Sequence, residues 1–170
     1  MLSSRKRQIK RIADNLWREN NLTPGFDIHD LLERKDIIFR AENLEDGVSG
    51  ALLVDGDLKI ITVSRSDGPQ RQRFTIAHEL GHEALHDGFS VSVSSTAKEY
   101  YRNTKSSTGE YEKEIEANFF AACLLMPEDA ILEEIHHDEA IDDNRISQLA
   151  TIFNVSQMAM AIRLSSLGFV

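Results

Sequence analysis

The feature that most constrains this chain is the sequence HELGH at residues 78–82, which has the pattern HExxH. Residues four apart lie on one face of an α-helix, so His78 and His82 can direct two imidazole nitrogens at one metal ion. Glu79 lies beside them, where its carboxylate can accept a proton from a water molecule activated by the metal. Apolar residues recur at helical spacing around the motif, which predicts an amphipathic helix. Thr75 or an earlier polar residue is a candidate for its N-cap.

The motif alone leaves alternatives open. HExxH occurs by chance in many proteins, and two histidines on an apolar helix can also be hydrogen-bonded members of a core. Residues 82–86, HEALH, form a second HExxH that overlaps the first. The spacing therefore does not decide whether His78 and His82, or His82 and His86, would bind the metal.

A catalytic zinc site usually has three protein ligands and one open position, so a third ligand is expected downstream. The predicted helix 112–125 offers Glu112, Glu114 and Glu116. We favour Glu114, because Asn118 follows it on the same helical face and could orient a ligand. Glu116 is the second choice. The plain alternative is that all three are solvated acids on an exposed face.

Composition excludes several classes of protein. The 170 residues suffice for one domain, and a net charge of −9 argues against general nucleic-acid affinity. Cys123 is the one cysteine, so an internal disulfide is excluded and we expect a buried apolar role for it. Neither a signal peptide nor an apolar run of about 20 residues is present. These features predict a cytoplasmic protein without membrane contact.

The chain before the motif predicts an α+β arrangement. Residues 4–20 form an amphipathic pattern whose basic outer face we interpret as solvated rather than as a nucleic-acid contact. Asp27 is a candidate cap for a short helix, and residues 37–40 are expected to form a strand. Strands at 48–54 and 58–63, joined by a turn signal at Asp55-Gly56, predict a hairpin. A strand beside the metal could pair its free edge with an extended peptide, or the hairpin could simply belong to the core sheet.

The chain after the motif predicts a loop and then helices. Residues 88–112 are polar without a period, which indicates a loop that could cover the active site. The buried side of the helix at 112–125 is predicted to comprise Ile115, Phe119, Ala122 and Cys123. A helix at 128–136 should start at Pro127, and His136-His137-Asp138 at its end is interpreted as exposed surface rather than a metal site.

The tail, residues 144–170, predicts two helices separated by a turn, with Ser156 as the second N-cap and Gly168 as the stop. The predicted buried residues of the second helix are Met158, Ala159, Ile162, Leu164 and Leu167. The spacing is similar to helix–turn–helix DNA readers, but few side chains could read bases, so we interpret the pair as a packing element. The whole chain is expected to be one metallopeptidase domain. Its parts would be an N-terminal segment at 1–40, a catalytic core at 47–126 and C-terminal helices at 127–170.

Three segments in order resemble the ImmA/IrrE metallopeptidases: RFTIAHELGHEALH, EIEANFFAACLLMP and ISQLATIFNVSQMAMAIRLSSLG. The family pattern, HExxH with a downstream E-x-x-x-N helix, matches His78, Glu79, His82, Glu114 and Asn118. The resemblance implies a zincin-like single domain with a thermolysin-like core, in which a small β-sheet packs on the HExxH helix. The implied metal ligands are His78, His82 and Glu114, with Glu79 as the base, Asn118 as the residue that orients a ligand and His86 as a nearby structural histidine.

The same resemblance implies a cytoplasmic endopeptidase that uses Zn²⁺, with Mn²⁺ as another candidate. Its implied substrate is a separate protein, a helix-turn-helix repressor encoded nearby, whose cleavage would relieve repression. The polar segment before Glu114 matches the family poorly. The alternative function is a zincin-fold module that senses or sequesters a regulator without hydrolysis.

Overall fold

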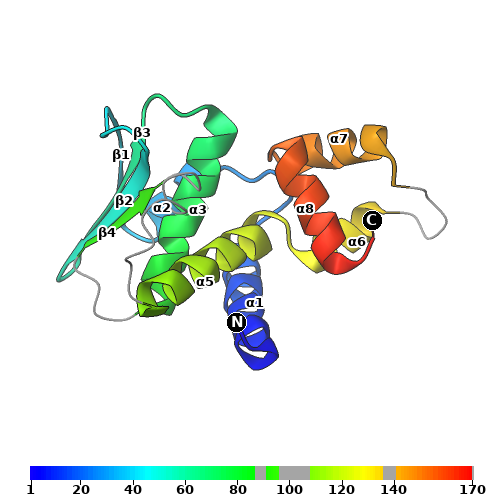
Figure 1. The fold of residues 1–170 in the computed structure, drawn as a ribbon, viewed down its shortest axis with the longest axis horizontal. Coiled ribbons are helices and arrows are strands. Elements are labelled where there is room, and N and C mark those ends of the chain that lie inside the picture. The colour runs from blue at the N-terminus through cyan, green and yellow to red at the C-terminus, as the bar shows by residue number, and fades with distance from the viewer. Residues whose placement is uncertain (87–90, 96–107, 136–140, 170) are drawn as a thin grey trace.

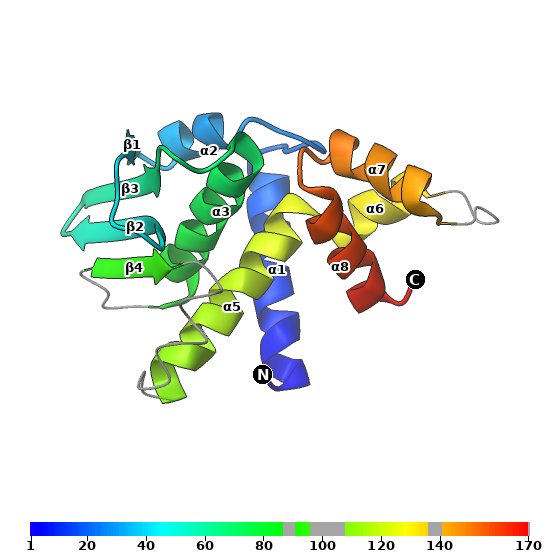
Figure 2. The ribbon, with the colours of Figure 1, turned by 45° about the horizontal axis from the view of Figure 1, so that its top comes forward.

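The computed structural model describes residues 1–86, 91–95, 108–135 and 141–169. These residues form an α+β fold in which a sheet lies at one end and a pair of C-terminal helices at the other (Figures 1 and 2). The helices are α1 (Ser3–Glu19), α2 (Ile28–Arg34), α3 (Pro69–Leu85), α5 (Thr108–Leu125), α6 (Glu128–Glu134), α7 (Asp143–Ile152) and α8 (Gln157–Leu167). The strands are β1 (Ile37–Glu42), β2 (Val48–Asp55), β3 (Leu58–Ser64) and β4 (Val91–Ser95).

The four strands pair in the order β1-β3-β2-β4. β1 and β3 are parallel, whereas β2 is antiparallel to both β3 and β4. Leu52, Ile61 and Val63 are buried, while Ile38 and Leu53 remain exposed. Because successive side chains of a strand point to opposite faces, the sheet has one covered and one exposed face. Helices α2 and α3 cover the buried face (Figure 2).

The hairpin is confirmed, but its turn is displaced by one residue. Asp55 pairs with Leu58, so Gly56 and Asp57 form the two-residue loop instead of Asp55 and Gly56. Gly56 has a φ of +58°, a left-handed conformation that glycine adopts without steric cost.

The prediction that the hairpin has a free edge is wrong. Part of the polar segment at 88–112 forms β4, which pairs with β2, while α5 already begins at Thr108. The prediction of a loop throughout 88–112 is therefore wrong for the described residues in it. β4, rather than β2, is the strand at that edge of the sheet.

Helix α3 crosses α5, and this crossing forms the centre of the molecule (Figure 1). Gly81 lies at the contact: a Cβ there would be 3.0 Å from the Cα and 3.1 Å from the carbonyl oxygen of Ala117. A glycine thus lets the two backbones approach more closely than any side chain would allow. The helix starts at Pro69 after Gly68, so Thr75, which is buried within α3, is not its cap.

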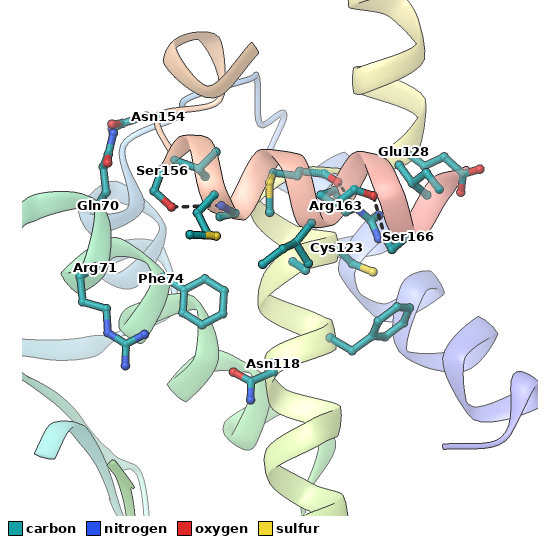
Figure 3. Close-up of a pocket in the computed structure, with 18 of the residues that line it drawn as sticks. Gln70, Arg71, Phe74, Asn118, Cys123, Glu128, Asn154, Ser156, Arg163 and Ser166 are labelled. Atoms are coloured by element: carbon teal, nitrogen blue, oxygen red, sulfur yellow. Dashed lines mark hydrogen bonds between the residues drawn. The ribbon is translucent and has the colours of Figure 1, made fainter. Parts of the chain in front are cut away.

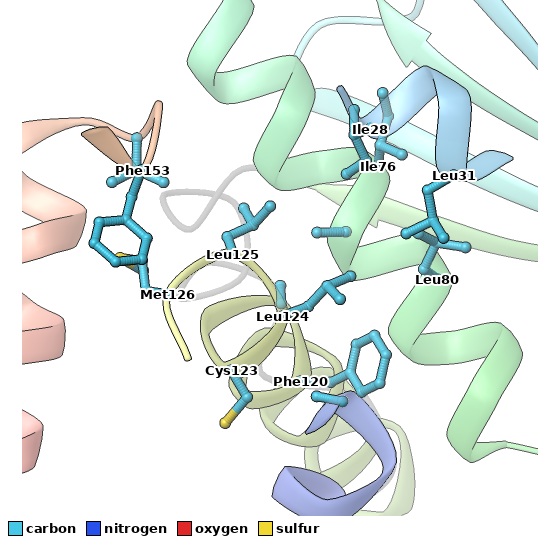
Figure 4. Close-up of a cluster of buried hydrophobic side chains, with 14 of the residues drawn as sticks. Ile28, Leu31, Ile76, Leu80, Phe120, Cys123, Leu124, Leu125, Met126 and Phe153 are labelled. Atoms are coloured by element: carbon cyan, nitrogen blue, oxygen red, sulfur yellow. The ribbon is translucent and has the colours of Figure 1, made fainter. Parts of the chain in front are cut away.

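One hydrophobic cluster joins the elements around this crossing (Figure 4). Ile76 and Leu80 of α3 meet Phe120 and Leu124 of α5 there, and Phe153, which follows α7, extends the cluster toward the C-terminal helices. The buried side of α5 includes Ala117, Phe120, Ala121, Cys123 and Leu124. The predicted position Phe119 is only partly buried, so the predicted face was rotated from the observed one, although Cys123 is buried as expected.

Helix α1 packs along α5. Ile9 and Ala13 are fully buried, and the indole N–H of Trp17 donates to the carbonyl oxygen of Leu124 at 2.5 Å. The outer face of α1 is not simply solvated, because Arg5 forms an ion pair with Glu116 of α5 at 2.6 Å.

The C-terminal pair forms as predicted, with Ser156 accepting a hydrogen bond from the Ala159 backbone and Gly168 ending α8 at a φ of +84°. Its predicted buried face was right at Leu164 and wrong at Met158 and Ile162, while Ala159 and Leu167 are partly buried. Met160, Arg163 and Leu164 are the buried residues of α8. Met158 is 72% exposed and Ile162 63% exposed.

The shorter predicted helices need little correction. Asp27 caps α2 by accepting from the His29 backbone, and Pro127 is the N-cap of α6 rather than its first residue. The segment 136–138 lies outside the described residues. Within the described parts of the chain, no helix is long and apolar enough to cross a membrane.

Candidate metal centre

Helix α3 places His78 and His82 one turn apart on its buried side. Their Nε2 atoms are 3.0 Å apart, and both rings are almost completely buried. Two imidazole nitrogens therefore face one point, as the four-residue spacing predicts.

Helix α5 brings Glu114 to the same point. Its Oε2 lies 3.2 Å from Nε2 of His78, and its Oε1 lies 3.0 Å from Nε2 of His82. Because α3 and α5 cross closely at Gly81, α5 lies near enough to the histidines for Glu114 to contact both. The carboxylate is 22% exposed, so the cluster is accessible from one side.

The geometry of this trio fits a metal ion. Two imidazole nitrogens and one carboxylate oxygen are a donor set typical of catalytic zinc. Ligands of a tetrahedral zinc with bonds of about 2.05 Å would be about 3.3 Å apart, and the contacts among the three side chains are 3.0 to 3.2 Å. In the described part of the chain, His78, His82 and Glu114 are the group found to fit such a site.

The electrostatics of the cluster favour a cation. Burial alone lowers the pKa of His78, but the hydrogen bond that its ring donates to Glu114 and the charges of Glu79 and Glu114 outweigh it and raise the pKa overall. Burial likewise raises the pKa of Glu114, yet its hydrogen bonds to His78 and His82 lower it to about 2. A carboxylate that stays ionised beside two imidazoles attracts positive charge to this point.

Glu79 follows the first histidine and is completely buried. Gly50 of β2 lies close by: a Cβ at this glycine would be 3.5 Å from Oε1 of Glu79 and only 2.4 Å from Cγ2 of Thr75. The absence of a side chain at position 50 thus lets β2 lie against α3 beside the glutamate.

Asn118 contacts the first histidine. Its Oδ1 is 3.0 Å from Nδ1 of His78, and since an amide oxygen accepts, the Nδ1–H of His78 donates. When the ring is neutral, that tautomer leaves a lone pair on Nε2, the atom that faces His82 and Glu114 and that a metal ion would bind. Asn118 and Glu114 act from the same face of α5, one turn apart.

A chain of contacts orients the second histidine. Nδ1 of His82 lies 3.1 Å from Nδ1 of His86, whose Nε2 lies 3.1 Å from Oε2 of Glu116. Burial lowers the pKa of His86, and a neutral His86 ring can accept from His82 while donating to Glu116. Glu116 in turn accepts two hydrogen bonds from Arg5, at 2.6 and 2.8 Å, which contribute most to its lowered pKa.

The structure thus separates the candidates that the sequence left open. Glu114 contacts both histidines of the first motif, whereas Glu116, the second choice, contacts His86 and Arg5. His86 is the C-cap of α3 in an extended conformation, so the overlapping motif does not continue as helix. Glu112 is exposed.

The contribution of Arg5 was missed, and no local signal could have found it. Arg5 and Glu116 are separated by 111 positions, and a basic residue on an outer helix face looks the same whether or not a distant acid meets it. Only the packing of α1 along α5 brings the two together.

A helix carrying HExxH beneath a small sheet, with a glutamate supplied by α5, defines the class of zincin-like α+β metallopeptidase folds. Residues 32–165 match the family model for peptidase M78, the IrrE N-terminal-like domain. The chain therefore belongs to this family, which confirms the resemblance to ImmA/IrrE metallopeptidases.

Among solved structures, the chain is similar to a Mycobacterium tuberculosis transcriptional regulator, with a TM-score of 0.64 and 23% sequence identity. The match covers 95% of this chain and 47% of the regulator, so the chain spans less than half the length of that protein. At this identity the likeness concerns the fold. No curated protein matches the chain.

Proposed function

We propose that this protein is a zinc-dependent endopeptidase that hydrolyses a peptide bond of a protein substrate. The observation that carries the proposal is the convergence of His78, His82 and Glu114 at one point, with the buried Glu79 following the first histidine. Family membership supports it, because the family is one of metallopeptidases.

In this proposal His78, His82 and Glu114 hold the metal ion. Zinc suits the two imidazoles and the carboxylate, and Mn²⁺ would be accepted by the same donors. When bound, zinc would supply Lewis-acid chemistry, polarising the substrate carbonyl and lowering the pKa of water.

Glu79 acts as the general base and then as the general acid. Its carboxylate accepts the proton of the attacking water and delivers it to the departing amine. Asn118 is proposed to act through His78 by fixing which ring nitrogen carries the proton.

The edge strand β4 is the proposed support for the scissile segment. It forms one edge of the sheet and contacts α3. An extended peptide can add to such an edge through main-chain hydrogen bonds. This takes the place of the expectation that the hairpin itself would offer the free edge.

The proposed substrate is a DNA-binding repressor encoded near this protein, in the cytoplasm. Two observations support it: membership of the IrrE-like family and the likeness of fold to a protein described as a transcriptional regulator. Cleavage of such a repressor would relieve repression. The net charge of −9 supports a protein rather than a nucleic acid as the direct partner.

The test uses the helix-turn-helix protein encoded next to this chain as the substrate. It is incubated with zinc-loaded wild type, with Glu79→Gln, and with Glu112→Gln as a matched control on an exposed residue. We expect Glu79→Gln to keep one zinc per chain by elemental analysis while cleavage falls by a factor of about 10² to 10⁴. The control should cleave like wild type, and a chelator should stop cleavage.

Two outcomes would contradict the proposal. Undiminished cleavage by pure Glu79→Gln protein would exclude Glu79 as the base. Stable binding of the regulator that survives both Glu79→Gln and chelation, without any cleavage by the wild type, would instead support the non-hydrolytic binding module.

A further inference from the structure

A groove of about 1030 Å³ lies between α3, α5 and α8. Met158 and Ile162 of α8, one turn apart and largely exposed, line it from one side. Phe74 of α3 and Ala122 of α5 line it from the others, and Figure 3 shows Phe74 facing the groove below α8. The exposed apolar residues of α8 thus belong to one concave surface rather than to scattered positions.

The groove adjoins the candidate metal centre at Asn118. Asn118, whose Oδ1 meets His78, is among its lining residues and lies at its lower end in Figure 3. Phe74 lies one helical turn before His78 on α3. A segment bound here would lie next to the point at which the metal ligands converge.

The charged residues of the groove are mostly basic, although the protein is acidic overall. Lys6, Lys10 and Arg71 are among its lining residues, and Glu128 is the acid among them. Arg71 also donates to Oγ of Ser49 at 2.9 Å and lies 4.0 Å from Asp67. Lys10 is already close to Asp14 and Glu128, at 3.0 and 3.8 Å. Lys6 is exposed and lies 5.9 Å above the Phe119 ring.

We propose that this groove binds an amphipathic helix of the substrate protein, with acidic residues flanking its apolar face. The proposal rests on the endopeptidase function and adds a recognition surface to it. The apolar lining accepts the apolar face, and the basic residues Lys6 and Arg71 attract the flanking acids.

A helix fits these walls better than an extended strand. The walls are helices, whose backbone N–H and C=O groups are used within the helices themselves. They can therefore offer side-chain contacts but no main-chain pairing to an added strand. Apolar residues one turn apart, such as Met158 and Ile162, form the kind of ridge against which the face of another helix packs.

The experiment measures binding separately from cleavage, using Glu79→Gln protein. The probe is a fluorescent synthetic helix of about 18 residues, some five turns, with leucines at i, i+3, i+4 and i+7 and glutamates beside them. A second probe carries lysines in place of the glutamates. Dissociation constants are measured by anisotropy for Ile162→Asp and Lys6→Glu.

Matched controls come from the same chain. Leu132 on α6 is 49% exposed and does not line the groove, so Leu132→Asp introduces the same kind of change elsewhere. Arg11 is exposed on α1 and likewise does not line the groove, so Arg11→Glu controls for Lys6→Glu.

We expect the acidic probe to bind more tightly than the basic probe, with an affinity that weakens as salt is added. Ile162→Asp should raise the dissociation constant about tenfold, and Lys6→Glu about threefold. Both controls should bind the acidic probe like the parent protein.

Equal binding of both probes, or unchanged binding by Ile162→Asp, would overturn the proposal. A dimer of the protein alone that Ile162→Asp dissociates in sedimentation experiments would also overturn it, because a second copy would then cover the groove. If the acidic probe binds in the groove but the wild type hydrolyses no substrate, the endopeptidase function is refuted while the groove proposal stands. If Ile162→Asp changes neither hydrolysis nor probe binding, the groove proposal is refuted while the endopeptidase function stands.

Discussion

The crossing of α3 and α5 differs sharply from the outer face of α8, although both are helical and rich in apolar residues. At the crossing, Phe120 is completely buried and Gly81 allows backbone contact with Ala117. On α8, Ile162 is 63% exposed. An apolar helical pattern thus gives a core in one place and a groove in the other.

The difference shows what helical spacing can and cannot specify. The positions of His78 and His82 relative to each other depend only on the geometry of one helix. The covered face of α8 depends on which neighbours it meets, and Arg163, rather than Ile162, lies inward, donating from Nε to the carbonyl oxygen of Met126. A charged residue can occupy an inner position when its hydrogen bond is supplied by a distant segment.

The sharpest measure of this contrast is a pair of truncations. We expect Phe120→Ala to lower the free energy of unfolding by about 3 to 5 kcal/mol, because it removes a fully buried ring at the crossing. Ile162→Ala should change it by less than about 0.5 kcal/mol. Urea unfolding of both variants measures the difference, and comparable losses would mean that α8 contributes to the core through Ile162.

Gly81→Ala tests the close approach of the two helices. The new Cβ would press on the Ala117 backbone, so we expect a loss of about 1 to 3 kcal/mol in unfolding free energy together with weaker zinc binding. Gly109→Ala is the control, since a Cβ there meets nothing within 4 Å and alanine favours helix. If Gly81→Ala binds zinc as tightly as wild type, the close crossing of α3 and α5 is not what brings Glu114 to the two histidines.

Arg5→Gln tests whether the N-terminal helix supports the metal centre. Without the two hydrogen bonds to Glu116, the contacts that orient His86 and His82 loosen, and we expect zinc affinity to fall about tenfold. A competition titration against a chromophoric chelator measures it, with Arg11→Gln on the same helix as the control. Unchanged affinity in Arg5→Gln would limit Arg5 to a role in helix packing.

The ion pairs of Glu83 provide a smaller, pH-dependent effect at the sheet side of α3. Burial raises the pKa of Glu83, but the hydrogen bond from Lys59 at 2.7 Å and the charge of Lys35 lower it below its ordinary value of 4.5. The ionised form is therefore favoured by folding. Its contribution, about 1 kcal/mol, is present above pH 4.5 and is lost as the pH falls toward the lower folded pKa.

Glu83→Gln should accordingly be less stable than wild type at pH 7, and the difference should shrink near pH 4. Urea unfolding of both proteins at the two pH values provides the measurement. A difference that is the same at both pH values would show that packing, rather than charge, accounts for the effect.

Local features of the chain were predictable because their causes are local. Asp27 and Ser156 cap their helices, and the strands of the hairpin follow from apolar and branched residues on either side of a glycine turn. The family pattern further pointed to Glu114, which the structure brings to His78 and His82. Each of these inferences needed only spacing, propensity or a motif.

Long-range features were not predictable, because they depend on which surfaces meet. Strand β4 was missed although Val91-Ser92-Val93-Ser94 alternates between apolar and polar residues, as a strand does. What the sequence did not specify is its pairing with β2. The ion pair of Arg5 and Glu116 joins residues far apart in the sequence. The sequence by itself determined the placing of His78 and His82 on one face of α3, since helical geometry sets their spacing. Only the tertiary structure decided which glutamate meets the histidines, which face of α8 is buried and where the groove lies, because packing between distant elements selects among faces that look alike locally.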